Sequence, residues 1–445
     1  MSVDRAAFED FRKSLSELAA RAPREELTDG QRMSRARQVF MRRLDRRLAF
    51  DMETCIHCGM CSEACHFFVA TGDARYAPVY KVEPLRRFYR REVSPLRLLY
   101  RPFTKGVDAN DLREWCELVY EACTGCGRCD MMCPMGINIS TAINVMREGI
   151  AAAGLAPDEL AALTDAQRED NAVFGVGAAE LKALVEKFRG DGADFRLDRE
   201  RADVLLLTTA VEVRLFPESI RAAATILDRA GADWTMSSAA FEATSTGLIS
   251  GDRAARKIAL ARIADAAKAC GAKTVVVPES GHAYQALRWE GADDLGVSLP
   301  FEVLALSEFI AREMAAGRLA LRKPAEFGSV TYHDPCRLGR QGGVYEEPRE
   351  ILKSMGVDVR DTEANRRENL CCGGGCGEYA IGRGANLRQR AFDLKRHELD
   401  AAGADAVVTG CVNCRVNLLT GAANSGWDTP ILSLAETVAA NLAEP

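Results

Sequence analysis

The sequence predicts a mixed α+β and α/β fold, in which a helical arm and a mostly helical cysteine-rich module precede an α/β domain with two pseudo-repeats. Three patterns predict it. Apolar residues recur every fourth position near the N-terminus, two cysteine clusters follow, and short β-branched runs then alternate with Ala-rich stretches. Strands that alternate with helices form parallel sheets, so we expect α/β architecture after residue 200. At 445 residues the chain is too long for one compact core.

The α/β region is predicted to be an internal duplication. "GAKTVVVPESGHAYQAL" and "GADAVVTGCVNCRVNLL" align without a gap, with Glu279 facing Cys411 and His282 facing Cys414. One half therefore keeps thiols that the other half lacks. We expect a helical arm over 1–50, the cysteine-rich module over 51–154, a helical connector over 155–200, a degenerate half over 201–325 and a thiol-bearing half over 326–445.

The arm is expected to be helical because Ala36, Phe40, Leu44 and Leu48 recur at i+4 spacing. Arginines surround this stripe. We favour the interpretation in which the apolar stripe packs in the core and the arginines form a solvated basic face. The alternative is a helix that docks on a partner or on an anionic membrane surface.

Composition excludes several classes of protein. No apolar run approaches the roughly 20 residues that span a bilayer, and the N-terminus lacks the apolar core of a signal peptide. We therefore expect a cytoplasmic protein. The net charge of -6 argues against nucleic-acid binding. Sixteen cysteines in a cytosolic chain indicate metal or cluster ligation rather than disulfides.

Two motifs, "CIHCGMCSEACH" and "CTGCGRCDMMCP", share the C-x₂-C-x₂-C-x₃-C spacing of two-cluster ferredoxins, in which the fourth cysteine ligates the other cluster. Zinc, which prefers pairs of C-x₂-C hairpins, fits this repeat poorly. We therefore predict two cubane [4Fe-4S] clusters. Their ligands are Cys55, Cys58, Cys61 and Cys133 for one, and Cys123, Cys126, Cys129 and Cys65 for the other.

Between the motifs lies an insert that contains "VYKVEPLRRFYRREVSPLRLLYRPF", where arginines alternate with aromatic and leucine residues. Such a segment could bind RNA, a membrane face or a partner subunit. We favour a partner surface.

A second set of thiols lies further along the chain. Cys336 follows a predicted strand, Cys371 and Cys372 adjoin a glycine run, and Cys411 and Cys414 follow another strand. Loops at one edge of a parallel sheet build the sites of α/β folds, so these thiols can converge there. Five thiols exceed what one zinc ion or one cubane cluster needs.

These residues, "YHDPC…CCGG…CVNC", resemble the CCG domain of heterodisulfide reductase subunits. From Asp51 onward, the order of ferredoxin module, insert and one intact CCG motif is similar to the D-subunit and DsrK-like iron-sulfur proteins. The resemblance implies that five cysteines hold a non-cubane [4Fe-4S] cluster. Because "FEATSTG" stands where a second CCG would lie, only one such cluster is expected. The implied ligands are Cys336, Cys371, Cys372, Cys411 and Cys414.

The resemblance implies an oxidoreductase acting on sulfur, which passes electrons through two cubanes to reduce or form a disulfide or polysulfide bond. The substrate would be a small disulfide or a DsrC-like carrier protein, and the electron partner a membrane cytochrome b-type subunit. Through that partner subunit the chain would be peripheral on the inner face of the membrane. His282 is our candidate proton donor, with a core residue as the alternative. Cys376 could be a spare ligand or an exchanging thiol, and a packed bystander is the simpler interpretation.

Two other functions remain open. One is an electron-transfer iron-sulfur subunit of a glycolate, lactate or glycerol-3-phosphate dehydrogenase, in which the CCG site only conducts. The other is a non-enzymatic scaffold whose C-terminal thiols bind zinc.

Overall fold

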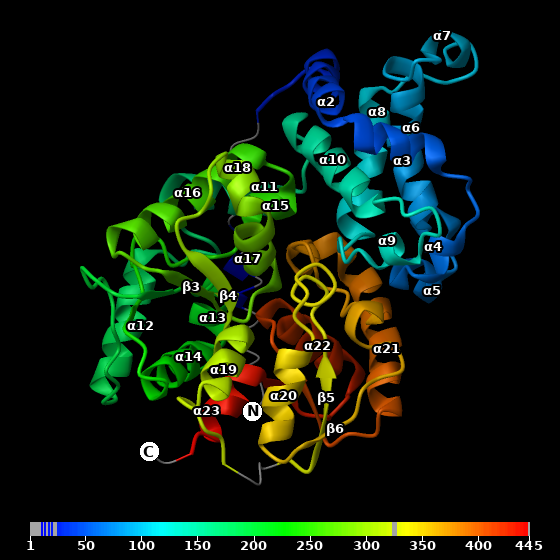
Figure 1. Cartoon of the computed structure of the whole chain (residues 1–445). Coiled ribbons are helices and arrows are strands. Elements are labelled where there is room, and N and C mark those ends of the chain that lie inside the picture. Colours follow the sequence, from blue (N-terminus) through cyan, green and yellow to red (C-terminus); the bar gives the residue numbers. More distant parts are fainter. Residues whose placement is uncertain are drawn as a thin grey trace.

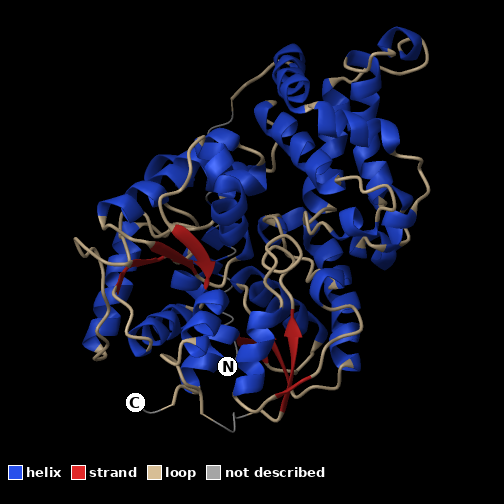
Figure 2. Cartoon of the chain, viewed as in Figure 1, coloured by secondary structure: helices blue, strands red, loops and turns tan. Residues whose placement is uncertain are grey.

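The computed structural model describes residues 25–322 and 327–443, together with residues 10, 11, 13, 14, 17, 19 and 20. A cysteine-rich helical module lies at the upper right of Figure 1, a first α/β half at the left and a second α/β half at the lower centre. Helices dominate, and the sheets are small (Figure 2). The predicted combination of a helical module with an α/β domain is confirmed.

The apolar stripe near the N-terminus lies on two helices, α2 (Asp29–Arg43) and α3 (Arg46–Thr54). Thr28 begins α2 in a capping box with Gln31, and Asp45 caps α3. All four residues of the predicted stripe are buried. Most of the first 24 residues of the predicted arm lie outside the described residues.

Seven further α-helices make up the module. Gly149 in α10 (Ile139–Ala152) lies so close to Phe40 that a Cβ would come within 2.1 Å of its ring, so the contact between α10 and α2 needs glycine there. The other six helices are α4 (Met60–Glu63), α5 (His66–Thr71), α6 (Pro78–Glu92), α7 (Arg97–Tyr100), α8 (Ala109–Cys116) and α9 (Arg128–Met132).

The insert between the cysteine motifs divides into a buried and an exposed part. Helix α6 buries Val82, Leu85, Phe88 and Tyr89, so these residues belong to the core of the module rather than to a partner surface. Only α7 and its flanking residues remain largely exposed. The predicted partner surface is therefore restricted to that part of the insert.

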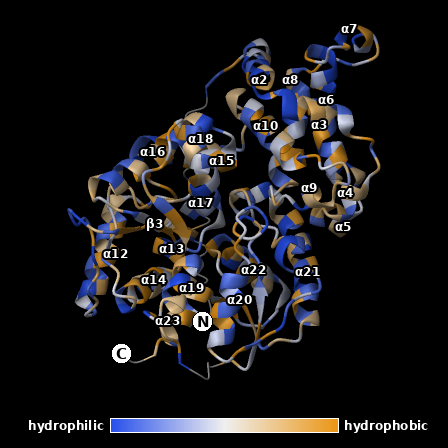
Figure 3. Cartoon of the chain, in the orientation of Figure 1, coloured by the Kyte–Doolittle hydropathy of each residue, from blue (hydrophilic) through white to orange (hydrophobic). Residues whose placement is uncertain are grey.

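The connector forms α11 (Asp158–Asp170) and α12 (Ala178–Gly190), which lead into the first sheet. That sheet is parallel, with the order β2-β1-β3-β4, and its apolar strand β3 is visible in Figure 3. Its strands are β1 (Val204–Leu206), β2 (Trp234–Thr235), β3 (Thr274–Val277) and β4 (Glu302–Ala305).

The second sheet repeats the topology of the first. Its order is β6-β5-β7-β8, again fully parallel, with Val330 opposite Ala406 as Val204 is opposite Thr274 in the first sheet. The prediction of two pseudo-repeats is confirmed. The strands are β5 (Ser329–His333), β6 (Asp358–Val359), β7 (Ala406–Thr409) and β8 (Ile431–Ser433).

Helices cover the sheets of both halves (Figure 2). In the first half they are α13 (Ala210–Leu215), α14 (Pro217–Arg229), α15 (Thr246–Ser250), α16 (Arg253–Ala269), α17 (Gly281–Gln285), α18 (Gly291–Leu295) and α19 (Leu306–Ala315). In the second half they are α20 (Glu346–Ser354), α21 (Ala385–Ala401), α22 (Val412–Ser425) and α23 (Leu434–Ala440).

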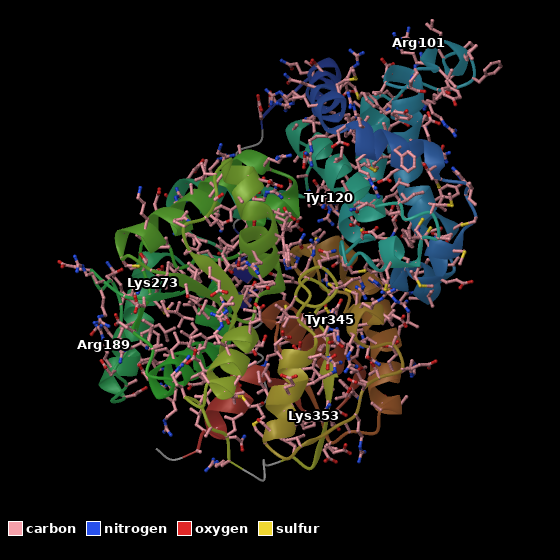
Figure 4. The ribbon with its side chains drawn as sticks, in the orientation of Figure 1. Arg101, Tyr120, Arg189, Lys273, Tyr345 and Lys353 are labelled. Carbon is pink, nitrogen blue, oxygen red and sulfur yellow. The ribbon has the colours of Figure 1, made fainter. Side chains whose placement is uncertain are left out.

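Buried polar contacts join the module to the first half. The Tyr120 hydroxyl donates to the Ser250 carbonyl at 2.7 Å, and Arg147 donates to the Ile249 carbonyl at 3.0 Å. Figure 4 shows Tyr120 at this junction. In the described part of the chain, no helix is both long and apolar enough to cross a membrane.

Candidate metal centres

The first thiol cavity is lined by Cys55, Cys58, Cys61 and Cys133. Cys55 directly follows α3, Cys58 lies in the loop before α4, Cys61 lies in α4 and Cys133 directly follows α9. Apolar side chains, including Val79, Val82 and Ile137, form the rest of the wall. Cys58 is exposed, so this cavity lies at the surface of the module.

The second thiol cavity is lined by Cys65, Cys123, Cys126 and Cys129. Gly125 and Gly127 have φ values of +59° and +72°, a left-handed conformation that lets the loop curl round the cavity. The cysteines of the two motifs thus group in the crossed sets that the ferredoxin spacing predicts. Each motif contributes its fourth cysteine to the cavity of the other.

The five thiols of the second half meet in one buried cluster, which we call the five-thiol cluster: Cys336, Cys371, Cys372, Cys411 and Cys414. Side-chain contacts link Cys371 to Cys336 and Cys372, Cys372 to Cys414, and Cys414 to Cys411. Their exposed fractions run from 1% to 7%. Sulfurs from three separate stretches of chain therefore converge, as the loops after β5 and β7 allow.

In the glycine-rich loop after the paired cysteines, neighbouring residues occupy the positions that Cβ atoms would take. Gly373 has φ +97°, and a Cβ there would lie 2.8 Å from the Ala391 Cβ. A Cβ on Gly374 would lie 2.6 Å from the Asn417 Cβ. The Asn417 side chain donates to the Cys372 carbonyl at 2.6 Å, which holds α22 against the loop. The glycines thus let helix and loop approach each other.

The thiols of the cluster influence one another's ionisation. The hydrogen bond from Cys371 lowers the pKa of Cys372, whereas contact with Cys126 raises the pKa of Cys371 and contact with Cys372 raises that of Cys414. Adjacent buried sulfurs cannot all carry a negative charge without a cation between them. This donor set therefore suits a metal centre.

Two buried histidines adjoin these sulfurs. Ligand atoms of His333 lie within 4.8 Å of those of Cys372 and Cys414, and His66 lies within the same distance of Cys126 and Cys371. Among the described residues, neither nitrogen of His333, nor Nε2 of His66, has a partner at ordinary hydrogen-bond geometry; their polar neighbours are the thiols of Cys372 and Cys126. Buried polar atoms are rarely left unpaired. These ring nitrogens would gain a partner if a metal centre, or further hydrogen-bond acceptors belonging to one, stood beside the thiols.

Buried cations surround the thiols without carboxylate partners among the described residues. Lys81, 2% exposed, donates from Nζ to the Cys65 sulfur at 3.3 Å and also to the Ala122 carbonyl. Burial opposes its charge, yet the neighbouring Cys65 and Cys123 outweigh burial and raise the pKa of Lys81. Such cations require a buried negative charge, which thiolate-bound iron-sulfur clusters would provide.

Two arginines complete this arrangement. Arg147, 1% exposed, donates to the Cys123 carbonyl at 2.7 Å. Arg337, 3% exposed, donates to the Cys376 sulfur at 2.6 Å and to Gln285. The sequence prediction missed these cations. Arg337 directly follows Cys336, which is the one sequence signal that could have found it.

His282 and Cys376 lie together beside α22. The His282 Nε2 accepts the Cys376 backbone N–H at 2.9 Å, and the Asn413 side chain lies 3.4 Å from Nδ1. A neutral ring with this acceptor at Nε2 carries its proton on Nδ1. Burial alone raises the pKa of Cys376, but the charges of Arg337 and Arg147 and the contact with His282 lower it to about 5.

The first half carries carboxyl groups in place of thiols. Glu242, in the "FEATSTG" segment, accepts the backbone N–H groups of Ala210 and Thr244 at 2.5 Å and 2.6 Å. Burial raises the pKa values of Glu242, Glu212 and Glu279 to about 7. No second five-thiol cluster occurs among the residues that the structure describes.

Comparisons with known proteins agree with these two groups of thiols. Residues 51–137 match a 4Fe-4S dicluster domain, and residues 330–419 match the cysteine-rich CCG domain. Over 405 residues, the chain is 25% identical to the D-subunit of the dihydromethanophenazine:CoB–CoM heterodisulfide reductase of Methanosarcina barkeri, covering 87% of this chain and 93% of that protein. This is an iron-sulfur protein similar to the heterodisulfide reductase D-subunit.

Two further relatives show the range of this similarity. The Hdr-like menaquinol oxidoreductase iron-sulfur subunit of Archaeoglobus profundus is 24% identical over 77% of this chain and 70% of its own. The EtfAB:quinone oxidoreductase of Syntrophomonas wolfei is 32% identical, over 38% of this chain and 24% of its own. These relatives are oxidoreductases or subunits of them, which supports an iron-sulfur electron-transfer role for this chain.

Proposed function

We propose that this chain is the iron-sulfur redox subunit of a heterodisulfide-reductase-like, DsrK-like complex, and that it reduces or forms a disulfide or polysulfide bond of a small thiol or carrier protein. One observation carries the proposal. Five buried thiols from separate segments meet in one cluster, and Cys126 of the second thiol cavity packs against it. A chain of redox centres would end at such a junction.

We assign a cubane [4Fe-4S] cluster to each of the two thiol cavities and a non-cubane [4Fe-4S] cluster to the five-thiol cluster. The buried rings of His66 and His333 beside the thiols and the buried cations support this assignment. When bound, such clusters supply transfer of single electrons. The chain itself would hold the sulfurs apart from water, since those of the five-thiol cluster are at most 7% exposed.

Protons for a released thiol need a donor inside the protein. We propose His282 in this role. Its neutral ring is a very weak acid, so His282 would first have to take up a proton from solvent at Nε2 and give up the hydrogen bond that this atom accepts from the Cys376 N–H. Asn413, which lies beside Nδ1, is the residue before Cys414. The position of His282 would thus connect the first half to the five-thiol cluster.

The partners remain part of the proposal. A membrane cytochrome b-type subunit would supply electrons, and a small disulfide or a DsrC-like carrier protein would be the substrate. The chain would then be a cytoplasmic protein attached to the inner face of the membrane. The similarity to subunits of larger oxidoreductases supports such an assembly.

A second candidate is an electron-transfer iron-sulfur subunit without thiol chemistry, as in glycolate, lactate or glycerol-3-phosphate dehydrogenases. Two observations favour it. The five-thiol cluster is buried, which restricts access for a substrate sulfur. The similarity to the EtfAB:quinone oxidoreductase also fits a chain that only conducts electrons.

An EPR spectrum of the oxidised protein distinguishes the two functions. With a small thiol such as 2-mercaptoethanol added, the disulfide chemistry predicts a new thiol-dependent signal, because the substrate sulfur would reach the five-thiol site. Cys371→Ser should abolish that signal. Cys116→Ser is the matched control, since Cys116 lies on α8 and contacts only backbone carbonyls in its hydrogen bonds. A spectrum unchanged by thiols, in protein that still passes electrons from a viologen donor to a quinone, would support the second candidate.

A further inference from the structure

An exposed apolar surface lies on residues 95–106, which we call the α7 loop. Leu98 is 73% exposed, Leu99 67% and Phe103 90%, and Leu96 is 52% exposed. Isolated exposed apolar residues are ordinary on soluble proteins, whereas four within eight positions form a patch. In Figure 1 the loop projects beyond the body of the helical module.

The α7 loop is also basic. It carries Arg97, Arg101 and Lys105 but no aspartate or glutamate, although the whole chain has a net charge of -6. Arg97 forms no ion pair with any residue that the structure describes. Arg101 lies 3.8 Å from Glu92, and Lys105 lies 3.7 Å from Asp111. Both of these acids are paired more closely with arginines outside the loop, Glu92 with Arg37 at 2.9 Å and Asp111 with Arg87 at 2.6 Å. Figure 4 shows Arg101 near the outer end of the loop. The positive charge of the loop is thus largely uncompensated within the protein.

The exposed side chains are held outward by a folded backbone. Arg91 donates to the carbonyls of Arg101 and Thr104 at 3.0 Å and 2.6 Å, which closes the loop at its base. The Arg90 guanidinium stacks over the Tyr100 ring, 5.6 Å from its centroid. The leucines and Phe103 therefore project from a backbone whose conformation is fixed by contacts within the protein.

We propose that the α7 loop binds the surface of an anionic lipid bilayer. Leu98, Leu99 and Phe103 would enter the boundary between headgroups and acyl chains, while the cations contact lipid phosphates. Apolar insertion and electrostatic attraction together are what attach peripheral proteins reversibly to membranes. Such binding would not depend on the disulfide chemistry proposed above.

Shape and composition favour lipid over the other occupants. A narrow projection offers little area against the roughly 800 Å² per partner of a stable protein interface. Proteins that bind single-stranded nucleic acids without sequence preference stack the bases on aromatic side chains. Three of the four exposed apolar residues here are leucines, which do not stack on bases but do partition into lipid.

Vesicle co-sedimentation of the purified, cluster-loaded chain tests the proposal. We expect binding to phosphatidylcholine vesicles that contain phosphatidylglycerol, little binding to phosphatidylcholine alone, and weaker binding at high salt. The triple variant Leu98→Ser, Leu99→Ser, Phe103→Ser should bind at least tenfold less. Arg97→Gln with Arg101→Gln should remove the preference for anionic lipid.

The matched control is Trp289→Ser with Val297→Ser, two apolar residues that are 55% and 61% exposed in the first α/β half. It should bind vesicles like the wild type. Iron content and circular dichroism must be unchanged in every variant. If the wild-type protein does not bind anionic vesicles, the proposal is wrong and a protein partner becomes the better explanation of the exposed loop. Equal binding of the triple variant would overturn it as well.

Discussion

Cys126 in the second thiol cavity contacts Cys371 in the five-thiol cluster, although one belongs to the helical module and the other to the second α/β half. Thr124 reinforces this junction, since its hydroxyl lies 3.4 Å from the Cys371 sulfur. Arg340 donates to the Cys126 carbonyl at 2.8 Å and fixes the same loop. The two proposed centres therefore meet directly, without a layer of apolar side chains between them.

The first prediction concerns the number of clusters. Cys371→Ala should lower bound iron by about four atoms per chain, because one four-iron centre loses a ligand. The ferredoxin-type clusters should remain, since their cavities are lined by other cysteines. Iron and acid-labile sulfide analysis measures this. Cys116→Ser should retain all iron, and loss of about eight atoms from Cys371→Ala would show that the centres depend on one another.

The second prediction concerns the charge of Lys81. Reduction adds a negative charge to a cluster, and a buried cation that donates a hydrogen bond to its ligand stabilises that state. Lys81→Met should therefore make the midpoint potential of the second cluster more negative, by the equivalent of about 1.5–3 kcal/mol. An EPR redox titration measures this shift. Lys81→Arg, which keeps the charge, should largely preserve the potential.

The first cluster provides an internal reference for that titration, because Lys81 lines only the second of the two thiol cavities. Its midpoint potential should remain unchanged in Lys81→Met. An equal shift of both potentials would indicate a general loosening of the module rather than removal of a local charge.

Local patterns predicted much of this arrangement, whereas contacts between distant segments were not predictable. The spacing of cysteines such as Cys65 and Cys129 indicates which thiols can share a cavity, because it reflects short loops and single helical turns. Alternating strands and helices likewise indicate parallel sheets. Lys81, in contrast, is one of many cations in a basic insert, and only its burial distinguishes it from them. The contact of Cys126 with Cys371 depends on how two domains pack, which no local pattern encodes.

The third prediction concerns the glycine that follows the paired cysteines. Gly373→Ala should destabilise the protein for two reasons, a positive φ and a close approach to Ala391. The backbone conformation alone costs about 1–3 kcal/mol. Gly426→Ala is a matched control, because Gly426 also has a positive φ but nothing lies within 4 Å of its Cβ position. Urea denaturation should show a larger loss for Gly373→Ala, and equal losses would contradict the steric part of this account.

The fourth prediction concerns Glu212, whose pKa burial raises from 4.5 to about 7. The folded protein then binds a proton between these values that the unfolded chain does not bind. The resulting stabilisation is fully present below pH 4.5 and is lost as the pH rises through about 7. Three donors, from Thr208 and Thr209, converge on a single carboxylate oxygen of Glu212, Oε2.

Glu212→Gln should retain those three hydrogen bonds on its amide oxygen and place an uncharged NH₂ group where the carboxyl group is protonated. Its free energy of unfolding should therefore fall less than that of the wild type between pH 5 and pH 8. Urea denaturation at several pH values measures the two slopes. Glu186→Gln, at a side chain that is 70% exposed, is the control and should keep the slope of the wild type. A Glu212→Gln slope equal to that of the wild type would mean that Glu212 remains ionised in the folded protein, its charge held by the three hydrogen bonds.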